Sequence, residues 1–208
     1  KPYNKRKKSN SPDERPPYQG SNPVSDIWSM KAIEFGGKYL SRAVATGEDV
    51  EARGNMMLSA TLAGIGFGSA GVHIPHACAY PIAGLKHSYQ AKGYKNIFIP
   101  HGISVIVTAP AVFRFTYDSD PSKHLKAAEL LKGAPLDNPG PESLPYELIK
   151  IMKEVAIPSG IKELGYTKED IPEIITRAMK QQRLLSIAPK NVNENDLQNI
   201  LTQSMENW

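Results

Sequence analysis

Residues 71–102 read GVHIPHACAYPIAGLKHSYQAKGYKNIFIPHG, and this stretch decides how the rest of the chain is interpreted. It contains four of the five histidines and the single cysteine: His73, His76, His87, His101 and Cys78. No Asp or Glu occurs in residues 52–117. Imidazole nitrogen suits Zn, Fe, Cu and Ni, but a catalytic metal site usually takes about three protein ligands and keeps one position open. The stretch therefore indicates part of a metal site; for any single histidine, a hydrogen-bonded core or surface imidazole is the alternative.

Length and composition fit one domain of about 208 residues with a buried core. One cysteine leaves no partner for an internal disulfide, which fits a reducing compartment. No apolar run approaches the roughly 18 to 20 residues of a membrane-spanning helix, so we expect no membrane partner. The net charge of +4 comes from residues 1–15, which carry six basic and two acidic residues, whereas the two signs balance in the remainder.

Residues 1–22 form a basic segment, KPYNKRKKSNSPDERPPYQGSN, that is rich in Pro, Ser and Lys and has little to bury. Such a composition predicts a loop or a disordered segment. The run KRKK also suggests nucleic-acid binding or targeting. Because no aromatic residues alternate with it and the rest of the chain is neutral, we expect a solvated loop and no nucleic-acid partner.

Residues 23–208 are predicted to form an all-α domain. Pro23 opens a helix in which apolar or small residues recur every three or four positions, and Gly47 ends it. The members of this face are Ile27, Met30, Ile33, Gly37, Leu40 and Val44. Residues 48–70 mix large apolar residues with Gly, Ala and Ser on several faces, which predicts a buried central helix that neighbours approach closely. Each glycine costs such a helix about 1 kcal/mol, so packing must hold it.

The sequence GFGSAG at residues 66–71 matches the dinucleotide-binding pattern G-x-G-x-x-G. That fingerprint requires a preceding strand, a following helix and an acidic residue about 20 positions later. Here the preceding residues are predicted to be helical, and no carboxylate follows until Asp118. We therefore expect no nucleotide-binding residues in this chain.

The second half contains two ambiguous segments. The run ISVIVTAPAVFRF at residues 103–115 is β-branched and apolar, which by propensity fits a buried strand, although Pro110 and the lack of a partner strand favour helix. Asp120 and His124 have the spacing of a metal-binding pair, but Pro121 makes Asp120 a helix cap and leaves His124 exposed. Helices are predicted at residues 145–155, 167–181 and 196–205, the second with Thr167 and Asp170 as a capping box.

Two motifs, PHACAYPIAG at residues 75–84 and PHG at 100–102, resemble the C-terminal half of the iron-containing (group III) alcohol dehydrogenases. The resemblance extends from about residue 17 to the end of the chain. Three further segments are similar to the hydroxyacid-oxoacid transhydrogenase branch of that family: PYQGSNPVSDIW at 17–28, AGIGFGSAGV at 63–72 and IAPKNVNENDLQNILTQSM at 187–205.

This resemblance implies the multi-helix C-terminal domain of a dehydroquinate synthase-like fold, with about seven or eight helices. His76 and His101 match two metal ligands of the family, and the other two, an Asp and a His, lie on an upstream helix that is not in this sequence. The metal would be Fe or Zn, and NAD would be bound mainly by an N-terminal domain, also not in this sequence. Tyr80 matches a position where many relatives place a histidine facing the nicotinamide. His73 and His87 match no ligand, and Cys78 is predicted to be buried.

The activity implied is oxidation of 4-hydroxybutyrate to succinate semialdehyde, coupled to reduction of 2-oxoglutarate to 2-hydroxyglutarate. The implied setting is the mitochondrion, with small-molecule hydroxyacid and oxoacid substrates and a homo-oligomeric assembly. Since half of the ligands and the cofactor domain are missing, we expect this chain by itself to be inactive. The alternatives are an ordinary metal-dependent NAD alcohol dehydrogenase of the same family and a metal-free helical interaction module.

Overall fold

The computed structural model describes residues 1–86 and 88–208. Its α-helices are α1 (Pro23–Ala45), α2 (Val50–Ala70), α3 (Ile74–Leu85), α4 (His101–Ile106), α5 (Ala109–Thr116), α6 (Pro121–Lys132), α7 (Ser143–Glu154), α8 (Ile171–Met179), α9 (Gln182–Leu185) and α10 (Glu194–Gln203). Short 3-10 turns are η1 (Tyr3–Lys5), η2 (Pro12–Glu14), η3 (Tyr117–Ser119), η4 (Ile161–Leu164) and η5 (Lys168–Asp170). The described residues contain no β-strand, only one isolated bridge between Gln90 and Phe98. The predicted all-α class is confirmed.

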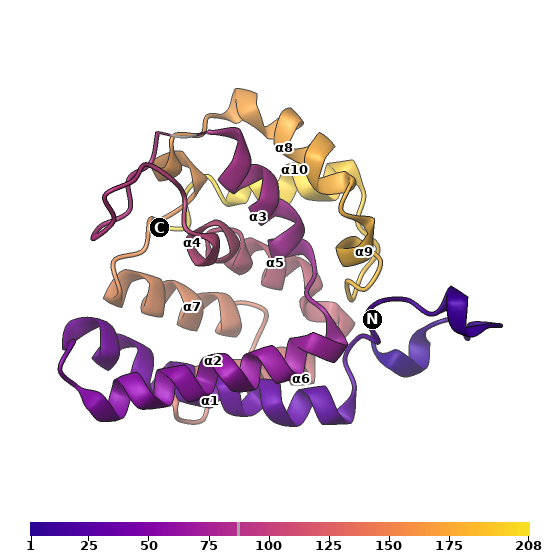
Figure 1. Cartoon of the computed structure of the whole chain (residues 1–208), viewed down its shortest axis with the longest axis horizontal. Coiled ribbons are helices and arrows are strands. Elements are labelled where there is room, and N and C mark those ends of the chain that lie inside the picture. The colour runs from indigo at the N-terminus through magenta and orange to yellow at the C-terminus, as the bar shows by residue number, and fades with distance from the viewer. Residues whose placement is uncertain (87) are drawn as a thin grey trace.

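The helices form layers (Figure 1). The long hairpin of α1 and α2 packs with α6 at one side of the molecule, and α4, α5 and α7 lie above it. On the opposite side, α8 and α10 pack together, and α3 runs obliquely between the layers in contact with α4, α8 and α9. The two helices that carry the ligand histidines predicted from the sequence, α3 and α4, therefore contact each other between the outer layers.

Side-chain caps fix where several helices begin. The Asn22 side chain accepts from the Ser25 N–H and the Ser25 hydroxyl accepts from the Asn22 N–H, which caps α1 just before Pro23. Asp120 caps α6 in the predicted way, with its carboxylate accepting from the Lys123 N–H at 3.2 Å. The capping box predicted at residues 167 and 170 is also present.

The main core surrounds α3 and not the first helix pair. Ile74, Cys78 and Ile82 of α3 are fully buried and pack with residues of α5, α8, α9 and α10. Pro81 lies inside α3, and the last-turn carbonyls are satisfied from outside because the Tyr166 hydroxyl donates to the Ile82 carbonyl at 2.6 Å. Helix α3 thus carries both the residues of the apolar core and, in its first turn, His76.

The ambiguous run at residues 103–115 is helical, as Pro110 indicated, but it is split into α4 and α5. The break lies at Val107 and Thr108, and Pro110 occupies the first turn of α5, where its missing N–H costs no hydrogen bond. Short helices such as α4 and α5 raise the number of α-helices in the described residues above the predicted seven or eight. A continuous apolar run in the sequence does not reveal an internal break.

The prediction that residues 48–70 form a buried central helix is wrong. Helix α2 packs mainly on α1, where the Ser59 hydroxyl donates to the Ala32 carbonyl at 2.8 Å, and it buries only Ala52, Ser59, Leu62 and Gly66. The apolar face predicted for α1 is also only partly correct, since Ile27 is 66% exposed. The lack of charged residues at 54–70 predicted burial, but in the structure many of these uncharged residues are exposed.

Residues 1–22 have two short 3-10 turns and otherwise no regular structure. The segment contacts the end of α2, where the N–H groups of Gln19 and Gly20 donate to the carbonyls of Ser69 and Ala70 at 2.7 and 3.2 Å. At the base of this segment, the N–H of Tyr3 donates to the Ser21 carbonyl at 2.9 Å. Lys1 therefore lies near the junction of α2 and α3.

None of the described helices is by itself long and apolar enough to cross a membrane. Taken together, α2 and α3 meet the length and composition that a span requires, but the chain bends by 108° between them.

Candidate metal centre

The turn between α2 and α3 positions the first candidate ligand. Gly71 ends α2 with a φ of 80°, and a Cβ there would lie 2.4 Å from Ile187 Cδ1 and 2.6 Å from the Tyr18 ring. Only glycine combines this conformation with such close neighbours. Pro75 in the first turn of α3 suits the helix start, and His76 follows it directly.

The second candidate ligand is brought back by the segment between α3 and α4. His101 is the first residue of α4, after Pro100 as the cap, and α3 and α4 contact each other. The ring centroids of His76 and His101 lie 5.3 Å apart with an interplanar angle of 62°. The structure therefore brings together the two imidazoles that the sequence proposed, although 24 residues separate them in the chain.

The environment of His76 favours the neutral form of imidazole, which is the form that binds metals. Burial lowers the pKa of His76 to about 4, and the neighbouring His101 adds to this effect. The His76 ring is thus neutral at physiological pH, with a nitrogen lone pair free for a cation. Neutral imidazoles suit Fe and Zn, so the donor chemistry fits the expected metal.

These two residues make only part of a site. Within residues 1–86 and 88–208, no group of three or more His, Cys, Asp or Glu side chains is arranged to hold a metal ion. The same region of sequence has no carboxylate between residues 52 and 117. A divalent cation held here alone would have two ligands and no neutralising anion.

Tyr80 flanks the pair. It lies one turn after His76 on α3, is 41% exposed, and its ring is stacked with that of His101 at a centroid distance of 6.1 Å and an angle of 30°. The phenol can therefore touch a molecule that approaches the two imidazoles. Its assignment to the nicotinamide or substrate remains a prediction.

The other singled-out residues lie apart from the pair or serve the core. Cys78 is fully buried, as predicted, and burial raises the pKa of its thiol to about 12. His73 occupies the N-cap position of α3 but makes no side-chain capping hydrogen bond; its Nδ1 is buried without a hydrogen-bond partner, and its ring contacts Phe113 edge-on. His87 lies outside the described residues.

The prediction that His124 is exposed is wrong, because the ring is partly buried between aromatic residues. Its Nε2 is 3.0 Å from the Thr116 hydroxyl, and its Nδ1 is 2.9 Å from the Asp120 carbonyl oxygen. Both nitrogens are thus used structurally. The i, i+4 spacing in the sequence is compatible with the contact between His124 and the Asp120 carbonyl, but nothing in the sequence indicated the contact with Thr116.

The comparisons with known proteins now settle the family. The family described as "Fe-containing alcohol dehydrogenase family, C-terminal" matches residues 18–205, so the chain belongs to the iron-containing alcohol dehydrogenases. Among solved structures, 1,3-propanediol oxidoreductase is similar with a TM-score of 0.77 and 26% identity, over 88% of this chain and 46% of that one. An alcohol dehydrogenase from Oenococcus oeni shares the fold with a TM-score of 0.78, over 88% of this chain and 45% of that one, at 24% identity.

Within the family, the chain is similar to proteins named "Hydroxyacid-oxoacid transhydrogenase, mitochondrial". The relative from Rattus norvegicus is 43% identical over 99% of this chain and 45% of its own length. The relative from Homo sapiens is 42% identical over 94% of this chain and 43% of its own length. The chain thus spans a little under half the length of these curated relatives.

Proposed function

We propose that the chain is the metal-binding part of a mitochondrial hydroxyacid-oxoacid transhydrogenase. The observation that carries this proposal is the pairing of His76 and His101 at 5.3 Å between ring centroids, at the two positions where the family has histidine ligands. The relatives' names support the activity and the mitochondrial location. The matched segments cover nearly the whole chain, including both histidine motifs.

In this proposal a hydroxyacid such as 4-hydroxybutyrate is oxidised to its semialdehyde, and 2-oxoglutarate is reduced to 2-hydroxyglutarate. A nicotinamide bound mainly by the other half of the enzyme carries the hydride between them. A divalent Fe or Zn would supply Lewis acidity to the substrate oxygen. His76 and His101 would hold that ion from this side, and Tyr80 would line the approach and offer a phenol for hydrogen bonding.

The geometry also explains why we expect the chain to be inactive by itself. Two imidazole ligands provide no negative charge to balance a divalent cation, and the family places the acidic ligand elsewhere. Hydride transfer further requires cofactor, metal and substrate to be held in contact, and positioning supplies much of the rate. The proposed partners are therefore small-molecule substrates, the other half of the enzyme and further copies in a homo-oligomer.

An ordinary NAD-dependent alcohol dehydrogenase is the second candidate, favoured by the similarity to 1,3-propanediol oxidoreductase. A transhydrogenase regenerates its nicotinamide within each cycle, whereas a dehydrogenase releases it. In a protein that joins this chain to the N-terminal half of the rat relative, oxoacid-dependent turnover of 4-hydroxybutyrate without added NAD is the expected result. Turnover that stops without a continuous supply of NAD would favour the dehydrogenase.

The metal assignment is tested in the same joined protein by counting bound Fe and Zn after dialysis. His76→Ala and His101→Ala should each abolish metal retention, because each removes one of the few ligands. His124→Ala is the matched control and should keep the metal, since that imidazole is occupied by Thr116 and the Asp120 carbonyl. Full metal retention in His76→Ala would contradict the site and leave a metal-free helical module as the better reading.

A further inference from the structure

The two substrates of the proposed reaction have more in common than the oxygen that reacts. In 4-hydroxybutyrate, two methylene groups separate the carbon that is oxidised from the carboxylate. In 2-oxoglutarate, two methylene groups likewise separate the carbon that is reduced from the distal carboxylate. A carboxylate that enters a protein site needs a partner, because burying its charge alone is costly. One cation, at one distance from the reacting carbon, can therefore bind the hydroxyacid and the oxoacid in turn.

The residues near the histidine pair in the sequence do not supply this cation. No Lys or Arg occurs in residues 54–85. The Lys86 ammonium at the end of α3 and the Arg114 guanidinium on α5 are each paired with a carboxylate, at 2.6 and 2.8 Å. The segment that contains Lys92 and Lys95 extends away from the first turn of α3 (Figure 1). The cation must therefore come from another element that packs beside α3.

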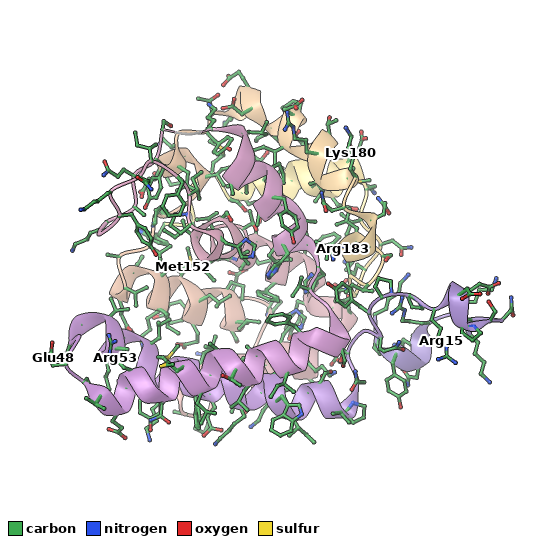
Figure 2. The ribbon with its side chains drawn as sticks, viewed as in Figure 1. Arg15, Glu48, Arg53, Met152, Lys180 and Arg183 are labelled. Carbon is green, nitrogen blue, oxygen red and sulfur yellow. The ribbon has the colours of Figure 1, made fainter. Side chains whose placement is uncertain are left out.

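Arg183 on α9 meets this requirement. Helix α9 contacts α3, and Leu184 and Leu185 of α9 are buried in the main core, which fixes the position of this short helix. Arg183 is exposed, and Figure 2 shows it beside the N-terminal end of α3, which carries His76. The ion pairs between residues that the structure describes do not include Arg183. Within residues 1–86 and 88–208, its charge is thus not neutralised by a carboxylate.

Tyr18 holds the Arg183 guanidinium at this end of α3. The Arg183 Nη1 donates to the Tyr18 hydroxyl at 3.2 Å, and the guanidinium carbon lies 5.8 Å from the centre of the Tyr18 ring. The ring itself packs on Gly71, where a Cβ would lie 2.6 Å from it, and Gly71 begins the turn that leads to His76. Because these contacts use a single N–H group, most of the guanidinium donors remain available for a ligand.

We propose that Arg183, held by Tyr18, binds the carboxylate that the hydroxyacid and the oxoacid have in common. A guanidinium pairs with a carboxylate through two parallel N–H···O hydrogen bonds. The Tyr18 hydroxyl accepts from Arg183, so its own proton is free to be donated to the same carboxylate. With its reacting end at the histidine pair and its carboxylate at Arg183, the substrate is held at both ends, which positions the reacting carbon for hydride transfer. This assignment rests on the proposed function and adds the substrate class: acids with a spacer of two methylene groups.

The test uses the protein that joins this chain to the N-terminal half of the rat relative, and it compares two acceptors. In 2-oxopentanoate, a methyl group replaces the distal carboxylate of 2-oxoglutarate. The unaltered protein should have the higher kcat/KM with 2-oxoglutarate. Arg183→Gln should reduce this preference by about 10- to 100-fold and keep the turnover of 2-oxopentanoate, because only the charged hydrogen bonds are lost. Tyr18→Phe should reduce the preference by a smaller factor.

Arg177→Gln is the matched control and should leave the preference unchanged, since Arg177 is an exposed arginine on α8 that is paired with Glu173. An equal loss with both acceptors in Arg183→Gln would contradict carboxylate binding, because a structural defect lowers both rates alike. An unchanged preference in Arg183→Gln would contradict it as well.

A binding measurement separates this assignment from the proposed function. If the unaltered joined protein turns over neither oxoacid, the proposed function fails, and the role of Arg183 is decided by calorimetry with glutarate, which keeps the distal carboxylate but cannot react. Glutarate should bind at least about tenfold more weakly to Arg183→Gln than to the unaltered protein and equally well to Arg177→Gln. Equal affinity for Arg183→Gln, or no binding of glutarate to the unaltered protein, would overturn the assignment.

Discussion

The largely buried imidazole of His73 should make the stability of this domain depend on pH in a defined window. Burial lowers the pKa of His73 from 6.5 to about 4, and the nearby terminal ammonium and the imidazoles of His76 and His124 add to this. The unfolded chain therefore binds more protons than the folded one between these two values. The contribution of this imidazole to the free energy of unfolding is fully present above about pH 6.5 and is lost as the pH falls toward 4.

The magnitude follows from the two pKa values. Between pH 7 and pH 5, a group that titrates at 6.5 when unfolded and at about 4 when folded costs the native state about 2 kcal/mol. This figure is an upper bound, because the ring keeps some exposure and solvent weakens the shift. Most carboxylates stay ionised in this window, so imidazoles and the terminal amine dominate the slope.

The comparison is between the unaltered chain and His73→Phe, both in the presence of a chelator. Phenylalanine keeps an aromatic ring against Phe113 but cannot be protonated. Urea unfolding at pH 7 and pH 5 should show a loss of stability that is smaller in the variant by about 1 to 2 kcal/mol. The NMR titration of His73 should have its midpoint near 4. Equal pH dependence of the two proteins, or a midpoint near 6.5, would refute the reasoning.

Three further outcomes follow from the structure. Gly37→Ala should destabilise the domain by about 1 to 3 kcal/mol in urea unfolding, because its Cβ would lie 2.4 Å from the Leu131 carbonyl oxygen on α6; its neighbour Gly36→Ala, with nothing within 4 Å, should be neutral or stabilising. Cys78 should not react with a thiol reagent in the native protein, and rapid reaction without unfolding would contradict its burial. Binding of DNA by residues 1–15 should be weak and should disappear with added salt in a fluorescence anisotropy assay, whereas salt-resistant, sequence-selective binding would contradict it.

Much of the candidate site could be predicted from the sequence because its signals are local. Pro75 and Pro100 mark the starts of two helices, and each is followed at once by the histidine that matters. The resemblance to the iron-containing alcohol dehydrogenases then indicated that His76 and His101 bind the same metal ion. What the sequence could not supply was the orientation of Tyr80, since stacking on His101 depends on how α3 and α4 cross.

The fold was predicted less well where the signal was a lack of charge. Apolarity along residues 54–70 has two physical explanations, burial within the domain or burial against something outside it, and periodicity cannot separate them. Helix α2 is mostly exposed because α1 is the helix that packs against it, and α1 covers only the side that contains Ala52, Ser59 and Leu62. A second miss, the half-buried His124, has a similar origin in a long-range contact with Tyr117 and Phe113.

The candidate metal centre needs more than its two histidines supply. A divalent cation between His76 and His101 needs an anionic ligand, and none of the described residues places one within reach. The required carboxylate must come from outside residues 52–117. Metal retention and the packing of the segment that supplies this carboxylate would be thermodynamically linked, because each stabilises the other by the same free energy. In the protein that joins this chain to the N-terminal half of the rat relative, removing the metal should therefore lower the urea concentration at which the protein unfolds.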